Sequence, residues 1–352
     1  LASPPDFMLW GPAMTTLIQT AEAPPRYIPN DPRPSLIGMT RDALADAMGR
    51  AGVPAKQRRM RAGQVWHWLY HRGVTSFAEM TNIARDLRQL GIAEGDVIFL
   101  HSSLKSLGFV QGGPQAVIDA LRDAVGATGT LLLPTYWIPG GTLLATCELP
   151  GYVFDPREHG THMGALPAMF LQQPGVERSV HPTHSCAALG PLARHLVGDH
   201  HRAPSVFGEG SPWQRFAELP QGKVLGLGIS MGPVTFYHRL EDEMGERFPV
   251  PIWLPRTYDM PCRDHDGRDC TVPVRPFDPE VTPRRIDQKT RGDLRDWFAD
   301  EFRRAGLRTE GRVAEAEAWF IRGPAFLDHL RRLAGQGITI YSTPEELAAV
   351  RR

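Results

Sequence analysis

Residues 96–133 of this 352-residue chain read DVIFLHSSLKSLGFVQGGPQAVIDALRDAVGATGTLLL. The apolar runs 96–100 and 130–133 predict two short buried strands, and apolar residues recur at helical spacing through residues 115–125. Gly113-Pro114 marks the start of that helix, because proline is favoured in a first helical turn. A strand, a helix and a strand joined by short links make a right-handed crossover between parallel strands. This stretch therefore predicts an α/β fold.

The rest of the C-terminal part extends this fold. Residues 223–229 predict a buried strand whose glycines allow another group to approach closely, and residues 263–274 predict a hairpin with Asp266-Gly267 at its turn. Residues 314–321 predict a strand or an amphipathic segment, and Thr343-Pro344 starts a last helix that runs to Ala349. We expect one α/β domain with an antiparallel supplement over residues 89–352.

The N-terminal part differs in composition. Residues 1–34 contain too many prolines for regular structure and are interpreted as a leader or linker. Apolar residues at helical spacing predict a small all-helical domain over residues 35–88. This domain has basic residues beside aromatic ones, a mixture that suits either RNA contact or a solvated basic face over an aromatic core: Lys56, Arg58, Arg59, Arg61, Trp66, Trp68 and Tyr70.

Composition limits the partners and the compartment. The 39 Lys and Arg residues balance the 39 Asp and Glu residues, so no global field attracts nucleic acid or an anionic membrane. No apolar run approaches the ~20 residues of a membrane span, and we expect a cytoplasmic protein. The cysteines are sparse and lack C-x-x-C spacing, which fits a reducing compartment; Cys262 and Cys270 flank the hairpin turn, where a disulfide is the alternative to two thiols.

Residues 178–190, RSVHPTHSCAALG, gather imidazoles, hydroxyls and a thiol. Pro182 biases His181 toward an extended conformation at a turn or strand end. A neutral histidine is the side chain best suited to accept a proton near pH 7, so His181 and His184 are candidates for proton transfer. The alternative is that both imidazoles satisfy hydrogen bonds under a loop.

Two further motifs follow predicted strands. The loop 101–108, HSSLKSLG, brings hydroxyls and a lysine to the carboxyl end of a strand, where open α/β sheets bind phosphates. The loop matches neither a Walker loop nor a G-x-G-x-x-G turn, and an ordinary strand-to-helix loop is the alternative. His238 and Glu241 are three residues apart, so a helix places both on one face. A metal site or an ordinary surface pair are the alternatives there.

Seven blocks in one order resemble the antibiotic N-acetyltransferase family, typified by the aminoglycoside 3-N-acetyltransferases. They are HSSLKSLG with the following GG and DAL, GTLLLPTY, FDP at 154–156, GALP, RSVHPTHSCAALG, GEGSPW at 208–213 and TFYHRLE at 235–241. The resemblance implies an α/β/α sandwich. Cys186 replaces an aromatic residue usual in the family, and Gly232-Pro233 replaces a more polar loop.

The resemblance also implies a reaction. It is the acetyl-CoA-dependent acetylation of an aminoglycoside antibiotic, at the 3-amino group of 2-deoxystreptamine, which confers resistance. No metal, DNA or membrane is expected to take part, and the protein is expected to be a monomer or a homodimer. The implied catalytic residues are His181 as the general base with His238, Glu241 and Thr235 beside it. The implied acetyl-CoA site comprises His101, Ser102, Ser103, Leu104, Lys105, Gly112, Gly113 and Ser185, and the implied ammonium-binding acids are Asp155, Glu209 and Glu241.

The helical N-terminal segment has its own resemblance. SLIGMTRDAL, KQRRMRAGQVWHWLYHRGV and FAEMTNIARDLR are similar to the accessory domain of the radical-SAM methyltransferases that methylate adenine in 23S ribosomal RNA. The C-x-x-x-C-x-x-C run that would hold that family's iron–sulfur cluster is absent downstream, so radical methyl transfer is not expected. A fusion of two unrelated pieces explains both resemblances.

Two other functions remain open from the sequence. Cys186, with His184 two residues before it, could carry the acetyl group as an acyl-enzyme on the way to another amine. Alternatively the chain acts as a ribosomal RNA-binding module through its first domain, although its balanced charge argues against this.

Overall fold

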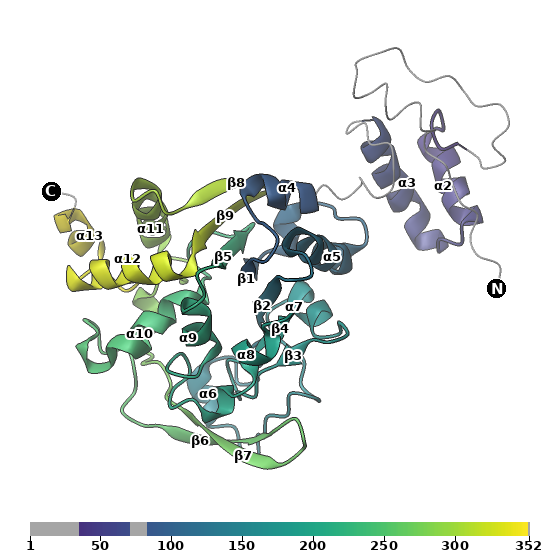
Figure 1. Cartoon of the computed structure of the whole chain (residues 1–352). Coiled ribbons are helices and arrows are strands. Elements are labelled where there is room, and N and C mark those ends of the chain that lie inside the picture. Colours follow the sequence, from purple (N-terminus) through teal and green to yellow (C-terminus); the bar gives the residue numbers. More distant parts are fainter. Residues whose placement is uncertain (1–34, 71–82, 351–352) are drawn as a thin grey trace. The chain divides into compact units, whose positions relative to one another are not determined.

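The computed structural model describes residues 35–70 and 83–350. The chain divides into two compact units, residues 1–82 and 83–352 (Figure 1). The proposed leader 1–34 and the last block of the N-terminal resemblance before residue 83 lie outside the described residues. Within the described ranges, no helix is both long enough and apolar enough to span a bilayer.

The described part of the first unit is a pair of helices, α2 (Arg41–Arg50) and α3 (Ala55–Tyr70). Thr40 begins α2, because its Oγ1 accepts the backbone N–H of Ala43 at 3.2 Å. The apolar faces of the two helices pack on each other through a small core that agrees with the predicted helical spacing: Leu36, Leu44, Ala47, Ala62, Val65 and Leu69.

Helix α4 (Ile83–Leu90) belongs to the second unit. It packs against α5 (Gly113–Val125) and against β8 (Thr309–Val313), with Leu87 and Leu90 buried. The boundary between the compact units thus falls before the residue-88 boundary that the sequence suggests.

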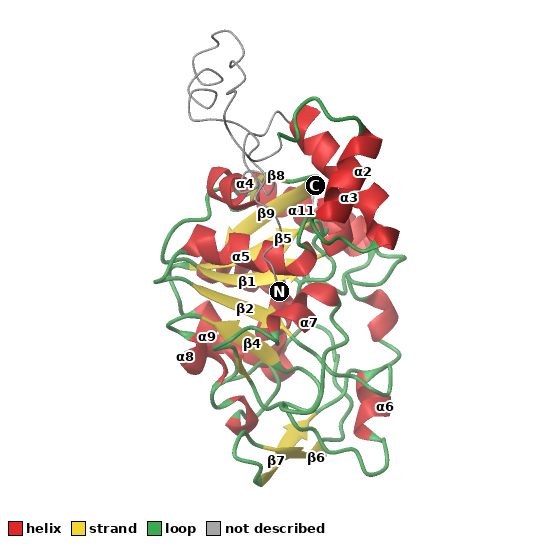
Figure 2. Cartoon of the chain, turned by 90° about the vertical axis from the view of Figure 1, so that its right-hand side faces the viewer, coloured by secondary structure: helices red, strands yellow, loops and turns green. Residues whose placement is uncertain are grey.

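The second unit is built on a seven-stranded sheet in the order β3-β4-β2-β1-β5-β9-β8, whose central strands are stacked one above the next in Figure 2. β1 is parallel to both β2 and β5, whereas β4, β3, β9 and β8 are antiparallel additions. The strands not yet given are β1 (Val97–Ser102), β2 (Thr130–Pro134), β3 (Glu177–Arg178), β4 (Cys186–Leu189), β5 (Gly222–Leu227) and β9 (Ala316–Arg322). The predicted parallel crossover and antiparallel supplement are confirmed.

Alternate residues of β1 enter two different cores. Val97 and Phe99 face the core under α8, α9, α11 and α12, whereas Ile98 and Leu100 face the core under α4, α5 and α7. Helices therefore cover both faces, as the α/β/α prediction requires (Figure 1). The helices not yet given are α6 (Leu143–Cys147), α7 (Ala165–Phe170), α8 (Ala193–Val197), α9 (Pro212–Ala217), α10 (His238–Met244), α11 (Gly292–Arg304), α12 (Gly323–Gly335) and α13 (Pro344–Val350).

Glycine in β5 has the role predicted for it. A Cβ on Gly226 would overlap the indole of Trp319, which occupies the adjacent position on β9. Only glycine therefore allows β9 to place a tryptophan against the centre of the sheet.

A separate two-stranded hairpin, β6 (Tyr258–Arg263) and β7 (Asp269–Val274), lies beyond the main sheet (Figure 1). It turns at Gly267, whose φ is +81°, as the Asp-Gly signal predicts. Cys262 and Cys270 face each other across the strands, but both are free thiols. Of the two alternatives for this pair, the structure has the reduced one.

Candidate active site

The carboxyl ends of β1, β2 and β5 bring polar residues together at one edge of the sheet. β1 ends at His101 and Ser102, β2 is followed by Thr135 and Tyr136, and β5 leads into the short 3-10 helix η4 (Thr235–Tyr237). Parallel strands of an α/β sheet place their ligand-binding residues at this edge.

Thr235 joins the end of β1 to the helices that follow β5. Its Oγ1 lies 2.9 Å from His101 Nε2 and 3.2 Å from Trp213 Nε1, and its backbone N–H donates to His101 Nε2 at 3.1 Å. Burial lowers the pKa of His101 to about 3, so the imidazole is neutral and accepts from Thr235. The structure therefore engages His101, which we expected at the acetyl-CoA site, as a buried support for Thr235.

His238 and Glu241 form a pair on one face of α10, as their spacing predicts. His238 Nδ1 lies 2.7 Å from Glu241 Oε2. The carboxylate only accepts hydrogen bonds, so the neutral ring carries its hydrogen on Nδ1 and its lone pair on Nε2. The Glu241 side chain is 1% exposed and that of His238 is 12% exposed. The pair thus has a buried orienting carboxylate and a ring that solvent or substrate can reach.

Aromatic rings hold the imidazole of His238 in place. Phe207 stacks on it at a centroid distance of 5.0 Å, and Phe277 packs against it at 5.1 Å. The ring of His184 lies between two other aromatic rings, with centroid distances of 5.2 Å to Phe207 and 4.5 Å to Tyr136. These contacts connect the segment after β2 to the His238–Glu241 pair.

His181 has the opposite hydrogen-bonding arrangement. Its Nδ1 accepts the backbone N–H groups of His184 at 3.0 Å and Thr183 at 3.3 Å, and its ring stacks on His200 at 4.5 Å. Burial, followed by the neighbouring imidazoles, holds the pKa of His181 well below its ordinary value. A neutral ring that accepts at Nδ1 carries its hydrogen on Nε2, which therefore offers no lone pair. The geometry of a general base is found at His238 and is missing at His181.

Ser185 belongs to a structural network around Arg178. Its Oγ donates to Thr135 O at 2.8 Å and accepts from Arg178 Nε at 3.1 Å. The Arg178 guanidinium also donates to the carbonyls of Thr135, Gly160 and His159. Ser185, which we expected at the acetyl-CoA site, is buried and its hydroxyl is fully used in tying residues 155–160 to the sheet.

Asp155 and Glu209, two of the expected ammonium-binding acids, differ in their exposure to solvent. Asp155 is buried and accepts both Nε and Nη2 of Arg157, at 3.0 and 2.7 Å, and this bond is the largest cause of the lowering of its pKa to about 2. Its carboxylate is therefore already neutralised by an arginine. Glu209 is exposed, in the loop before α9.

The 102–105 loop is a half-exposed turn at the end of β1. Ser103 donates its backbone N–H to Leu227 O at 2.9 Å, and its Oγ accepts from Ser106 at 3.0 Å. Leu104 starts a 3-10 helix, η2 (Leu104–Leu107), and Lys105 is exposed. Gly112, with a φ of +84°, caps α5, and Gly113 is its first residue. The loop and the helix start remain candidates for binding the acetyl donor.

Cys186 is inaccessible. It lies in β4 with 0% exposure, and burial raises the pKa of its thiol well above the ordinary value. A buried thiol held in its protonated form is a poor nucleophile. This geometry disfavours an acyl-enzyme at Cys186.

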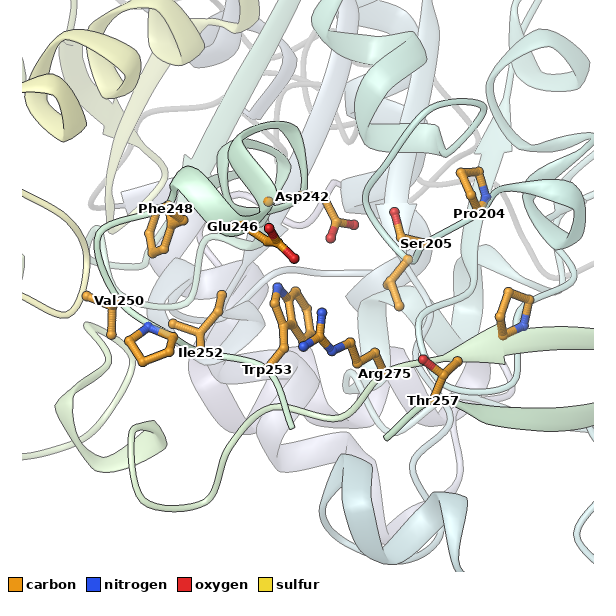
Figure 3. A pocket seen from close by; sticks show the side chains of 14 residues that line it. Pro204, Ser205, Asp242, Glu246, Phe248, Val250, Ile252, Trp253, Thr257 and Arg275 are labelled. Atoms are coloured by element: carbon orange, nitrogen blue, oxygen red, sulfur yellow. The ribbon is translucent and has the colours of Figure 1, made fainter. Parts of the chain in front are cut away.

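A cavity of about 660 Å³ lies beside α10 (Figure 3). Figure 3 shows Asp242 of α10 and Glu246 of the following 3-10 helix η5 (Gly245–Arg247) pointing into it, with Trp253 and Arg275 across from them. Burial raises the pKa of Asp242, whose Oδ2 accepts the backbone N–H of Phe207 at 2.7 Å. A cavity with two carboxyl groups and an aromatic floor suits a cationic sugar.

A second cavity, of about 780 Å³, lies next to the 102–108 loop. Ser106 and the segment 228–231 line it on one side. Arg303 and Arg308, which also line it, are each paired with Glu310 at 2.9 Å. Arginines and acids balance in this lining: Arg295, Arg303, Arg308 and Arg312 against Asp296, Glu310, Glu315 and Glu317.

Sequence reasoning missed several residues of the site. Tyr136 and Trp213 belong to the blocks GTLLLPTY and GEGSPW, which the resemblance includes. The neighbouring sequence gave no sign that either residue contacts the Thr235 region. Nothing in the sequence marked Phe207 and Phe277 as site residues, because an aromatic residue in a loop usually belongs to the hydrophobic core.

Among residues 35–70 and 83–350, no group of three or more His, Cys, Asp or Glu side chains could hold a metal ion.

A buried glutamate that orients a reachable histidine, at the carboxyl edge of an α/β/α sheet, is an arrangement suited to proton transfer in an enzyme. Comparison with known proteins makes this specific. Residues 99–334 match the family model for aminoglycoside 3-N-acetyltransferase. The chain therefore belongs to the aminoglycoside 3-N-acetyltransferase family, whose members are acyltransferases.

Relatives and solved structures agree. The chain is 34% identical over 247 residues to aminoglycoside N(3)-acetyltransferase III of Salmonella sp, covering 67% of this chain and 84% of the relative. It is 39% identical over 256 residues to aminoglycoside N(3)-acetyltransferase VIII of Streptomyces fradiae, covering 66% and 84%. The AAC-IIIb binary complex with CoASH has a TM-score of 0.61 at 26% identity, covering 74% of this chain and 97% of that one. AAC-VIa bound to sisomicin has a TM-score of 0.56 at 28% identity, covering 70% and 93%.

The N-terminal segment has a separate match. Residues 35–90 fit the family model for the ribosomal RNA large subunit methyltransferase N-terminal domain, so the second resemblance is confirmed as well. This match runs through α4, which packs with the acetyltransferase unit.

Proposed function

We propose that this chain acetylates the 3-amino group of the 2-deoxystreptamine ring of aminoglycosides, with acetyl-CoA as the acetyl donor, and thereby confers resistance in the cytoplasm. The observation that carries the proposal is the 2.7 Å contact between His238 Nδ1 and Glu241 Oε2, in a chain of this family. That contact leaves Nε2 of a partly exposed ring free to take a proton.

His238 acts as the general base. An aminoglycoside amine is protonated near pH 7 and attacks a thioester only after it loses a proton, so His238 Nε2 removes that proton as the amine approaches the carbonyl carbon. Glu241 stabilises the resulting imidazolium at 2.7 Å. The new C–N bond forms and the C–S bond breaks. The proton held by His238 passes to the departing thiolate of CoA, and the second proton, which the nitrogen loses as it becomes an amide, leaves to solvent.

The hydroxyl of Tyr136 stabilises the oxyanion that develops during this attack. Tyr136 is 5% exposed, lies beside Thr235, and its hydroxyl has no partner at hydrogen-bonding distance among the described residues. Thr235 Oγ1 gives its one hydrogen to the neutral His101 Nε2 and accepts from Trp213 Nε1, so it has no hydrogen left for the oxyanion. A donor fixed before the reaction stabilises developing charge without reorganisation.

The cavity beside α10 binds the aminoglycoside. The carboxylates of Asp242 and Glu246 attract the ammonium groups of the aminoglycoside, with Glu209 as an exposed addition. The loop after β1 and the start of α5 bind acetyl-CoA, with these residues along its pantetheine arm: Ser102, Ser103, Leu104, Lys105, Gly112 and Gly113.

The test is release of free CoA thiol when purified full-length protein and acetyl-CoA are mixed with sisomicin, a gentamicin or apramycin. We expect release that requires the aminoglycoside, and NMR of the product should show the acetyl group on N3 of the deoxystreptamine ring. Folded protein that releases no thiol with any of these drugs would contradict the proposal, and acetylation at another nitrogen would refute its regiochemistry.

A further inference from the structure

One oxygen of the orienting carboxylate has no visible partner. Glu241 Oε2 receives His238, whereas Glu241 Oε1 is buried and has no partner at hydrogen-bonding distance among the described residues. A buried carboxylate oxygen without a donor loses its hydration and gains no hydrogen bond in return, which is unfavourable. A donor close to Oε1 would therefore fix the orientation of the Glu241 carboxylate and reduce the negative charge that faces His238.

Tyr341 is the candidate for such a donor. It is 1% exposed, and its hydroxyl likewise has no partner at hydrogen-bonding distance among the described residues. Burial is the first cause of a raised pKa at this hydroxyl, and the charge of Glu241 is the second, with Arg285 opposing it. The phenol therefore keeps its hydrogen, and it is close enough to Glu241 for the charge of the carboxylate to act on it.

The backbone on both sides of Tyr341 is fixed to the segment that carries Arg285. Ile286 donates its N–H to Ile340 O at 2.9 Å, and Arg284 Nε donates to Tyr341 O at 3.2 Å. The Tyr341 ring also meets Phe248 edge-on at 6.2 Å. The hydroxyl is thus held in position from two sides.

Arg285 reaches the same group of residues. Its guanidinium lies 4.9 Å over the ring of Phe277, the ring that packs on His238. It also forms two 2.8 Å bonds with Asp287, which fix its direction. Arg285, Tyr341, Glu241 and His238 therefore form one cluster, contributed by three separate segments of the chain.

We propose that Tyr341 is a positioning residue for the reaction: its O–H donates to Glu241 Oε1, while Arg285 donates to the phenolic oxygen. The inference rests on the proposed function of the His238–Glu241 pair. It adds a residue outside the stretch 99–334 that matches the family model. The C-terminal segment after α12 therefore takes part in orienting the base.

This bond has a predictable effect on catalysis. It fixes the Glu241 rotamer and withdraws charge from the carboxylate, so its loss leaves more negative charge facing His238 and favours the imidazolium. The acid limb of the kcat/KM profile then moves to higher pH, and kcat falls because the base is less well oriented. The charged or titratable groups facing the pair from the packed elements are His184, Asp242, Arg285, Asp287 and Tyr341.

The test compares Tyr341→Phe with Tyr237→Phe. Tyr237 is a matched control, because its hydroxyl is also buried without a partner at hydrogen-bonding distance among the described residues. Its surroundings differ, because the charge that acts on its hydroxyl is that of Arg308 and its ring packs on Phe298 and Phe326. We expect Tyr341→Phe to lower kcat about 10-fold with KM for both substrates within about 2-fold, and to move the acid limb upward. Tyr237→Phe should leave the acid limb unchanged.

A second readout does not need activity. In histidine-labelled protein, the NMR titration curve of the His238 ring, assigned with His238→Asn, should shift to higher pH in Tyr341→Phe and stay in place in Tyr237→Phe. An unshifted curve and profile in a folded Tyr341→Phe protein would overturn the proposal. If this variant does not fold, the wild-type Tyr341 hydroxyl proton decides: a slowly exchanging downfield resonance supports the bond, and its absence refutes it. Wild-type protein that transfers no acetyl group contradicts the proposed function, while the titration still tests the bond.

Discussion

The segment 178–190 and helix α10 both carry histidines, but they use them in opposite ways. The first has two imidazoles, hydroxyls and a thiol within a few residues, and the structure buries His181, His184 and Cys186. The second has one His-x-x-Glu pair, whose histidine stays 12% exposed with Nδ1 bonded to a carboxylate. A dense cluster of reactive residue types is therefore a weaker sign of chemistry than one accessible nitrogen with an oriented lone pair.

The largest effect should come from His238→Asn. The asparagine amide can still donate to Glu241, but it has no equivalent of Nε2, so kcat should fall by about 10²- to 10⁴-fold with the fold intact. The measurement is steady-state thiol release with sisomicin, alongside thermal unfolding. The same substitution at the other region, His181→Asn, is the control, because asparagine Oδ1 can replace Nδ1 as the acceptor. Loss of turnover in folded His181→Asn, with turnover kept in His238→Asn, would reverse the comparison.

His181→Phe should affect stability instead of catalysis. Phenylalanine keeps a ring against His200 but removes the acceptor of two backbone N–H groups, those of Thr183 and His184. We expect the free energy of unfolding to fall by about 2–4 kcal/mol, while kcat of the folded protein stays within about 10-fold. Denaturant unfolding measures the first quantity, and an unchanged midpoint would show that Nδ1 has no structural role.

The buried histidines should also make stability depend on pH. Burial lowers the pKa of His200 to about 3, below the ordinary value of 6.5, so the unfolded chain binds more protons than the native protein between these values. His200 therefore contributes stability above about pH 6.5 that is lost as the pH falls toward 3. Urea midpoints measured from about pH 7 to about pH 4.5 should decrease more steeply for the wild type than for His200→Gln, and parallel curves would contradict this.

Cys186→Ala should have the smallest effect. The thiol is fully buried and protonated, so direct transfer predicts unchanged kcat and a loss of about 1 kcal/mol of stability. Mass spectrometry of the protein with acetyl-CoA alone should show no acetylated Cys186. An acetyl adduct there, or a loss of turnover in the folded variant, would restore the acyl-enzyme mechanism.

Sequence patterns predicted those features that depend on local order. The continuous apolar runs of β1, β2 and β5 indicated buried parallel strands, and the spacing of His238 and Glu241 indicated one helix face. The short edge strand β3, with two residues, has no period to detect. The central strands, the helix between β1 and β2 and one helix face could therefore be predicted, but the edges of the sheet could not.

The roles of individual polar residues depended on partners that the spacing does not reveal. Asp155 was expected to bind substrate, yet Arg157, two residues away, neutralises it. Ser185 and His101 were expected at the acetyl-CoA site, yet Arg178 and Thr235 engage them in the interior. The tautomer of His181 follows from two backbone N–H groups in its own turn, which no pattern of residue types indicates.

The most direct test of the account is the tautomer of these two rings. Nitrogen NMR of histidine-labelled protein at about pH 8 reports which ring nitrogen carries the hydrogen, with His238→Asn and His181→Asn giving the assignments. We predict a hydrogen on Nδ1 and a lone pair on Nε2 in His238, and the reverse in His181. A lone pair on Nε2 of His181, together with a hydrogen on Nε2 of His238, would contradict the assignment of His238 as the general base.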